Sequence, residues 1–288
     1  MRLPIAPVPT RALLCASHTL DLARPCVMGI VNVTPDSFSD GGRLHEPALA
    51  IAHARRLRDE GADIVDVGGE STRPGAMPVS DAEEIDRVLP VVEALARDGA
   101  LVSVDTTKPA VMRAAVAAGA AMINDVRALQ EPGALDAAAA SQAAVCLMHM
   151  RGEPRTMQQG PHYADVVAEV RAFLSTRARA CEAAGIARER IVVDPGFGFG
   201  KTVEHNFALL RGLAGIVALG YPVLVGWSRK SSLGAVTGRE VNERLAASLA
   251  AALASVARGA AIVRVHDVRD TVDALKVWGA AGLPEPGG

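Results

Sequence analysis

The chain reads Gly29-Ile30-Val31-Asn32-Val33-Thr34-Pro35-Asp36-Ser37-Phe38-Ser39-Asp40-Gly41-Gly42 near its start, where an apolar run gives way to a polar loop. The run 27–31 is short and bounded by turn residues, which is typical of a buried strand. It ends at Asn32. The loop that follows is dense in Thr, Pro, Asp, Ser and Gly. Because loops on a rigid scaffold often carry the chemistry of a protein, we expect a functional loop here.

The same unit, an apolar run followed by a helical segment, recurs along the chain. Seven further runs are expected to be strands: 63–67, 101–104, 121–123, 143–148, 190–193, 222–226 and 261–265. The helices expected after the eight strands are 46–60, 80–97, one from Pro109, 133–141, 163–184, 203–219, 242–257 with a shorter turn near Ser231 before it, and 268–278. Ser80 to Glu83 has the pattern of a capping box. Pro90 predicts either a kink or a division of its helix into two pieces.

Eight strand–helix units predict a single α/β domain, a closed (β/α)8 or TIM barrel. The strands are continuous apolar runs, as expected where both faces of a parallel sheet are buried. A doubly wound open sheet is the alternative. The barrel domain is expected over 27–288, preceded by an extension over 1–26. In the extension, 12–15 and 18–20 could form a small hairpin that plugs one end of the barrel.

The composition excludes several classes of partner. The formal net charge is −2 and there is no block of like charge, so we expect neither a nucleic-acid nor a membrane partner. The N-terminal segment has no continuous apolar run, which favours a cytoplasmic protein. None of the four cysteines belongs to a CxxC pair, so buried free thiols are expected.

Polar residues follow nearly every strand, at the end of a barrel where active sites are built. They are Asn32, the motif from Gly69 to Gly75, Asp105, Asn124, Asp125, His149, Asp194, the run from Ser228 to Ser231, Arg264, His266 and Asp267. Asp125 and Asp267 could simply cap the next helix. Asp105 is followed by Thr106, which can act as a cap itself, so its carboxylate is expected to face the barrel mouth.

The balance of these groups describes a ligand. Asp105, Asn124 and Asp194 offer acceptors to a flat group rich in N–H donors. Lys230, Arg264 and His266 offer donors and positive charge to an anion. We therefore expect a substrate that combines an N–H-rich heterocycle with a phosphate or a similar group.

Other motif interpretations fit less well. The run from Gly196 to Thr202 resembles a phosphate loop, but Pro195 stands where a P-loop requires glycine, and Lys201 stands where the dinucleotide pattern requires its third glycine. A tight transition-metal site of a barrel hydrolase would need several imidazoles in one shell. A weakly held Mg²⁺, bridged by Asn32 and a substrate phosphate, is more plausible.

The residues carry a family resemblance. The motif from Gly29 to Gly42, the motif Gly69-Glu70-Ser71-Thr72-Arg73-Pro74-Gly75 and the loop from Asp194 to Lys201 closely resemble those of the dihydropteroate synthases, pterin-binding enzymes of the folate pathway that sulfonamides inhibit. The resemblance implies transfer of a dihydropterin methylene from diphosphate to 4-aminobenzoate. It also implies a TIM barrel, a Mg²⁺ cofactor and a homodimer.

The resemblance further implies roles for particular residues. Pterin binding would fall to Asp105, Asn124, Met148, Asp194, Phe199 and Lys230, and diphosphate binding to Asn32, Thr72, Arg73, Arg264 and His266. Mg²⁺ would be held by Asn32. The 4-aminobenzoate pocket would comprise Thr34, Pro35, Phe38, Pro74, Lys230 and Ser231, and the catalytic set Asn32, Asp36, Arg73, Lys230, Arg264 and His266.

Two rival functions share part of this pattern. A pterin-binding methyltransferase would need the carboxylates and the amide, but it has no use for a diphosphate clamp or for the loop from Thr34 to Phe38. A catalytically silent pterin-binding partner should have lost Arg264 and His266, which are both present.

Overall fold

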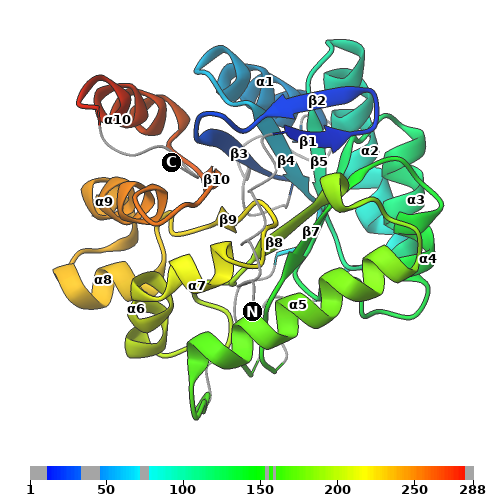
Figure 1. The fold of residues 1–288 in the computed structure, drawn as a ribbon. Coiled ribbons are helices and arrows are strands. Elements are labelled where there is room, and N and C mark those ends of the chain that lie inside the picture. Colours follow the sequence, from blue (N-terminus) through cyan, green and yellow to red (C-terminus); the bar gives the residue numbers. More distant parts are fainter. Residues whose placement is uncertain (1–11, 34–45, 72–77, 153–155, 158–159, 283–288) are drawn as a thin grey trace.

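The computed structural model describes residues 12–33, 46–71, 78–152, 156–157 and 160–282. Its core is a barrel of parallel strands surrounded by helices (Figure 1). The strands are β3 (Cys26–Asn32), β4 (Ile64–Gly68), β5 (Val102–Asp105), β6 (Met122–Asp125), β7 (Ala144–Met148), β8 (Ile191–Asp194), β9 (Leu224–Val225) and β10 (Ile262–Val265). They pair in the order β8-β7-β6-β5-β4-β3-β10-β9, and a bridge between Val193 and Val223 joins the two edges. The barrel is therefore confirmed, and the open-sheet alternative is wrong.

A helix follows each strand, with short additional helices near the end of the chain. The α-helices are α1 (Glu46–Asp59), α2 (Asp81–Arg97), α3 (Pro109–Ala117), α4 (Ala134–Ala139), α5 (Val166–Ala183), α6 (Val203–Arg211), α7 (Leu213–Val217), α8 (Ser231–Thr237), α9 (Leu245–Val256) and α10 (Val268–Ala280). The 3-10 turns η2 (Arg188–Arg190) and η3 (Val241–Glu243) precede β8 and α9.

Some expected bounds were wrong for local reasons. The helix expected over 203–219 is two helices, because Gly212, a poor helix former, lies between α6 and α7. The strand expected over 222–226 pairs regularly only over Leu224–Val225. Helix α2 runs through Pro90 without dividing, so the two-piece alternative was wrong. Ser80 does cap it, with its hydroxyl accepting from the Glu83 N–H at 3.2 Å.

A hairpin closes one end of the barrel. Strands β1 (Ala12–Cys15) and β2 (His18–Asp21) pair antiparallel, as expected for the extension. Leu13 and Cys15 are fully buried in one cluster with Met28 of β3. All four cysteines are buried and free, which confirms the sequence expectation. Over the described ranges, no helix is both long and apolar enough to cross a membrane.

The inner face of the barrel changes character along each strand. Side chains two residues apart lie on the same face of a strand. The buried apolar layer beside the hairpin includes Ile64, Met122, Val192 and Ile262. Two positions later, on the same inner face and nearer the carboxyl ends, come Asp66, Asn124, Asp194 and Arg264. An apolar floor thus supports a polar layer at the open end.

Candidate active site

An ion-pair network spans the polar layer. Arg264 of β10 donates from Nε to Asp66 Oδ2 of β4 at 2.6 Å and from Nη2 to Asp105 Oδ2 of β5 at 2.7 Å. Asn124 of β6 donates from Nδ2 to the same Asp66 oxygen at 3.0 Å. Asp105, Asn124 and Arg264, which the sequence nominated, therefore belong to one network, in which a fourth residue, Asp66, joins Asn124 to Arg264.

That fourth residue, Asp66, was missed from the sequence. It is fully buried, and its second oxygen, Oδ1, has no hydrogen-bond partner among the described residues. The only signal was an acidic residue within an otherwise apolar strand, which favours a specific role over packing. Asp66 thus links Asn124 and Arg264 across the barrel.

Burial sets the electrostatics of this network. It raises the pKa of Asp105, while the Arg264 guanidinium pulls it down and the neighbouring Asp66 carboxylate pushes it up again. Burial alone would lower the pKa of Arg264, but the charges of Asp66 and Asp105 more than reverse that, so its pKa is raised and it stays cationic. Two carboxylates share one guanidinium, which leaves an excess of acceptors in the polar layer.

Asp194 stands at the end of β8 beside this network. It is 6% exposed, and its Oδ1 accepts from the Gly196 N–H at 2.7 Å. Burial raises its pKa to about 6, and the Gly196 hydrogen bond opposes that rise. A buried carboxylate with a raised pKa, held in a loop at a barrel mouth, marks a candidate for binding or catalysis.

The loop after Asp194 is shaped by glycine and fastened by Lys201. Gly196 has a φ of 68°, and a Cβ there would lie 2.0 Å from the His149 carbonyl oxygen, so only glycine fits. Lys201 Nζ donates to the carbonyl oxygens of Gly196 at 2.8 Å and Phe199 at 2.9 Å, and lies 3.0 Å from His149 Nδ1. Burial lowers the pKa of Lys201 to about 7 and that of His149 to about 3. These two residues stabilise the loop.

Lys230 reaches into the same region from the loop after β9. Its Nζ lies 4.2 Å from the centre of the Phe199 ring, a cation–π contact. Burial and the nearby Arg264 charge lower the pKa of Lys230, Asp194 and Asp105 raise it, and the net result is a pKa of about 8. Lys230 is therefore close enough to interact electrostatically with the charged groups of the network. Met148, at the end of β7, is 4% exposed.

His266 lies above β10 and is joined to the neighbouring loop. Its Nδ1 is 2.9 Å from Ser228 Oγ, and its backbone N–H donates to the same oxygen at 3.2 Å. Arg229, which has a φ of 59°, pairs with Asp267 through Nη2 and Oδ1 at 2.5 Å. Asp267 makes no side-chain bond to the start of α10, so the expected capping role was wrong for it. The Asp125 carboxylate does accept backbone N–H groups of its own turn, from Arg127 and Leu129.

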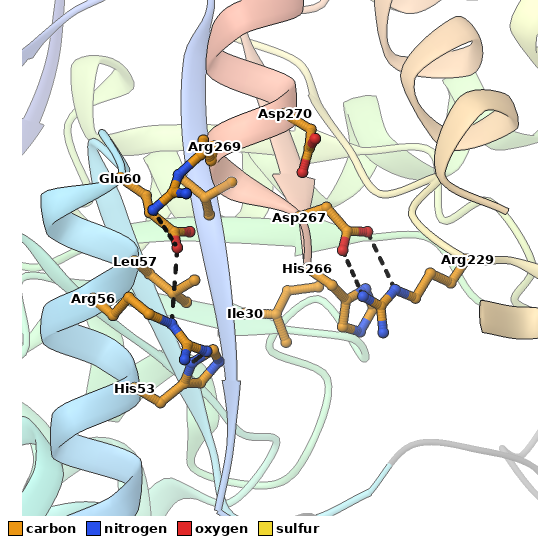
Figure 2. Close-up of a pocket in the computed structure, with 11 residues that line it drawn as sticks. Ile30, His53, Arg56, Leu57, Glu60, Arg229, His266, Asp267, Arg269 and Asp270 are labelled. Atoms are coloured by element: carbon orange, nitrogen blue, oxygen red, sulfur yellow. Dashed lines mark hydrogen bonds and ion pairs between the residues drawn. The ribbon is translucent and has the colours of Figure 1, made fainter. Parts of the chain in front are cut away.

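A cavity of about 540 Å³ opens beside His266, between α1 and α10 (Figure 2). Arg229 and Asp267 lie on one side of it, and Arg56 and Glu60 of α1 on the other. Its lining mixes three arginines with three carboxylates, and Arg56 and Arg269 pair with Glu60 as Arg229 does with Asp267. The cavity therefore has no marked preference for either sign of ligand.

The remaining nominated residues divide into two groups. Asn32 is half-buried at the end of β3, opposite Gly68, and Ser231 is exposed at the start of α8. Those outside the described residues are Thr34, Pro35, Asp36, Ser37, Phe38, Thr72, Arg73 and Pro74.

The segment that carries Thr72 to Pro74 is flanked by a half-buried cluster of contacts around Lys108. Lys108, just before α3, donates to Glu70 Oε2 at 2.6 Å, to Glu84 Oε2 at 2.5 Å and to the Val79 carbonyl oxygen at 2.7 Å. Glu84 is 1% exposed. Sequence reasoning missed Lys108, because only its partners far along the chain distinguish it from a surface lysine.

Comparisons with known proteins agree with this architecture. The pterin binding enzyme family model matches residues 28–266. The dihydropteroate synthase of Escherichia coli K12 is 54% identical over 260 residues, covering 90% of this chain and 92% of the relative. Xanthomonas albilineans dihydropteroate synthase, solved with 4-aminobenzoic acid, superposes with a TM-score of 0.90 at 56% identity, covering 95% of this chain and 99% of the other. The Yersinia pestis enzyme, solved with a sulfonamide drug, gives 0.89 at 49% identity, covering 94% and 99%. A barrel whose mouth gathers these carboxylates, amide and cations, and which matches such relatives over nearly its whole length, belongs to the pterin-binding enzyme family and, within it, to the dihydropteroate synthases.

Proposed function

We propose that this chain condenses 6-hydroxymethyl-7,8-dihydropterin diphosphate with 4-aminobenzoate to give 7,8-dihydropteroate and diphosphate. The observation that carries the proposal is the polar layer: Asp105, Asn124 and Asp194 lie on one inner face of the barrel, next to the cations Arg264 and Lys230. The acceptors of the polar layer suit the N–H edge of a pterin, and the cations beside them suit the diphosphate.

The pterin ring would lie between the network and the loop after β8. The buried carboxylates of Asp105 and Asp194 would accept from its N–H groups, and Asn124 would hydrogen bond to its edge. Met148 and Phe199 would line the faces of the ring. Burial makes each of these hydrogen bonds stronger than it would be in water.

The leaving diphosphate would be held above the ring. Arg264 uses Nε and Nη2 for Asp66 and Asp105, which leaves N–H donors on Nη1 for an anion. We assign His266, Asn32, Thr72 and Arg73 to the same diphosphate. The amide oxygen of Asn32, half-buried at the end of β3, is a ligand that Mg²⁺ accepts, so the site fits this metal. When bound, Mg²⁺ would supply positive charge to the departing diphosphate oxygens.

The chemistry needs little proton transfer. The electron-rich dihydropterin stabilises a cation at its methylene carbon, so the carbon–oxygen bond to diphosphate can break ahead of attack by the arylamine. The chain would then contribute mainly electrostatic stabilisation of the leaving group and correct placement of the amine. The catalytic set of this proposal is Asn32, Asp36, Arg73, Lys230, Arg264 and His266.

We place 4-aminobenzoate beside Lys230 and Ser231, in a pocket completed by Thr34, Pro35, Phe38 and Pro74. Because the Yersinia pestis relative was solved with a sulfonamide drug, we also propose that sulfonamides compete for this pocket. We propose a cytoplasmic location, since the substrates are small and charged.

The activity itself is tested by incubating the protein with dihydropterin diphosphate, 4-aminobenzoate and Mg²⁺ and measuring diphosphate release and dihydropteroate. Formation of both in equal amounts supports the proposal. Methyl transfer from methyltetrahydrofolate to a corrinoid protein, without diphosphate release, would favour the methyltransferase alternative. Pterin binding without either reaction would favour a silent partner.

Asn32→Ala is expected to raise the Mg²⁺ concentration needed for half-maximal activity by about tenfold, because one of the few protein ligands is removed. Binding of 6-hydroxymethylpterin, which lacks diphosphate, should stay within twofold of the unmodified protein. Activity titrations against Mg²⁺ and calorimetry measure the two effects. An unchanged Mg²⁺ requirement would contradict the assignment of Asn32.

We further propose that the chain forms a homodimer through α8, η3 and α9. Val236, Val241 and Leu245 are exposed by 65%, 47% and 37%. Helix α9 has the sequence LAASLAAALASV, so its outer face is as apolar as its buried one. A helix that is apolar on all sides normally has a second surface to pack against.

The double substitution Val236→Asp and Val241→Asp is expected to convert the dimer to monomer, because it places charges in the apolar contact. Sedimentation velocity measures the change. Leu14→Asp, which alters an exposed apolar residue of the hairpin, is the matched control and should leave the dimer intact. A dimer that survives the double substitution would place the interface elsewhere.

A further inference from the structure

Ser228 makes both of its recorded hydrogen bonds to one residue. Its Oγ accepts from the His266 backbone N–H at 3.2 Å and lies 2.9 Å from His266 Nδ1. Ser228 is 7% exposed, so water does not readily replace either contact. The two loops that follow β9 and β10 thus meet at a single serine hydroxyl.

The donors and acceptors of this pair can be assigned. A hydroxyl has one proton to donate and a backbone N–H can only donate, so Ser228 Oγ must be the acceptor of the backbone bond. No other acceptor for the Ser228 proton is recorded among the described residues, so that proton goes to Nδ1. A neutral imidazole that accepts at Nδ1 carries its own proton on Nε2.

A second contact holds the same two loops together. Arg229, next to Ser228, pairs through Nε and Nη2 with both oxygens of Asp267, next to His266 (Figure 2). The φ of 59° at Arg229 is unfavourable for a non-glycine residue. It is maintained by bonds to both its backbone groups, from N–H to Ser248 Oγ at 3.0 Å and to its carbonyl oxygen from Arg244 at 3.1 Å. Such strain persists where the surroundings over-determine a conformation, often at functional sites.

We propose that Ser228 is a positioning residue that holds neutral His266 in its Nε2–H form, so that His266 presents a hydrogen-bond donor to the diphosphate. The Arg229–Asp267 pair keeps the two loops in register for this contact. The proposal rests on the proposed function in one respect, the assignment of diphosphate to His266. The imidazole form itself depends only on the geometry described above.

The first test measures the imidazole directly. Nitrogen-15 NMR of the unmodified protein at a pH where His266 is neutral is expected to show the Nε2–H form, with the signal assigned by its loss in His266→Gln. Ser228→Ala should give a mixture of both forms, and Ser228→Thr, which keeps the hydroxyl, should restore the original spectrum. An Nδ1–H form in the unmodified protein would overturn the proposal without any variant.

The second test separates this role from a merely structural one. Ser228→Ala is expected to weaken inhibition by inorganic diphosphate by about tenfold, the loss of one hydrogen bond to a charged group. Its affinity for 6-hydroxymethylpterin should stay within twofold, and Ser228→Thr should recover diphosphate inhibition. Equal losses for both ligands would overturn the positioning role. Ser255→Ala, which removes a fully buried hydroxyl on α9, is the control for general destabilisation.

The diphosphate site and the positioning role of Ser228 can be disproved separately. If inorganic diphosphate does not inhibit the unmodified protein, or if His266→Gln leaves its inhibition unchanged, the proposed diphosphate site is wrong, and with it the use we assign to the Nε2–H donor. If diphosphate inhibits but the spectrum and the inhibition are both insensitive to Ser228→Ala, only the positioning role is wrong.

Discussion

Asp194→Asn is expected to weaken binding of 6-hydroxymethylpterin by about 10- to 100-fold. The amide keeps the shape of the side chain and can still accept from Gly196, but the pterin N–H donors lose a charged acceptor, worth about 1.5–3 kcal/mol. Isothermal calorimetry measures the loss. Affinity within twofold of the unmodified protein would contradict the role of Asp194.

Asp125→Asn is the matched control for this substitution. Asp125 is also a buried aspartate at a strand end, and burial raises its pKa to about 6 as well. Its carboxylate, however, accepts from the backbone of Arg127 and Leu129 in its own turn. Its replacement should reduce stability while pterin affinity stays within twofold.

The raised pKa of Asp194 adds a pH dependence to the same prediction. The pterin donors need the ionised carboxylate, and the free protein holds this group with a pKa of about 6. Affinity should therefore be full above pH 6 and fall as pH drops below it, because protonation competes with binding. In Asp194→Asn this pH dependence of affinity should be weaker, because Asp105 is then the remaining carboxylate of the proposed pterin site.

Asp66→Ala is expected to lower the free energy of unfolding by about 3–5 kcal/mol, the cost of removing one partner from a buried ion pair. Arg264 would keep Asp105 but lose its shorter contact, and Asn124 would lose its recorded acceptor. Urea unfolding followed by circular dichroism measures the change. A loss below about 1 kcal/mol would show that the Asp66–Arg264 pair contributes no more than an exposed ion pair does.

Two further variants make this test specific. Asp98→Ala removes the acceptor of Arg55 in an exposed ion pair and should lower the free energy of unfolding far less than Asp66→Ala does. Adding Arg264→Met to Asp66→Ala should recover part of the lost stability, because no buried guanidinium then remains with too few partners. Arg264→Met alone completes the comparison. If the loss of stability in the double variant equals the sum of the losses in Asp66→Ala and Arg264→Met, the two side chains are not coupled.

The pattern of the chain was sufficient to predict the barrel and most of its polar mouth. Apolar runs of three to six residues, most of them followed by a polar residue, located the strands within one or two positions. The helix-breaking tendencies of proline and glycine did not by themselves predict where helices are interrupted. Pro90 did not divide α2, whose apolar face is packed in the core, whereas Gly212 alone was enough to separate α6 from α7.

Asp66 and Lys108 could not be found in this way, and Ser228 was nominated only as part of a polar strand end, because each acts through a residue far along the chain. Asp66 and Arg264 are 198 positions apart, and Ser228 and His266 are 38 apart. Lys108 and Ser228 are ordinary residue types at their positions, and Asp66 stands out only as an acidic residue in an apolar strand. Nothing in the sequence names the partner of any of the three, because the fold alone brings the partners together. Likewise, Asp125 and Asp267 look alike in sequence, yet one holds its own turn and the other pairs with Arg229.

The sequence by itself determined which residues form strands and which polar groups stand at their carboxyl ends, because strand formation and burial follow from the local alternation of apolar runs and turn residues. Only the tertiary structure decided which of those groups meet. Hydrogen bonds and ion pairs act over about 3 Å, and joining β3 to β10 and β8 to β9 sets those distances. The pairing of Arg264 with Asp66 and Asp105, and of His266 with Ser228, is a property of the closed barrel.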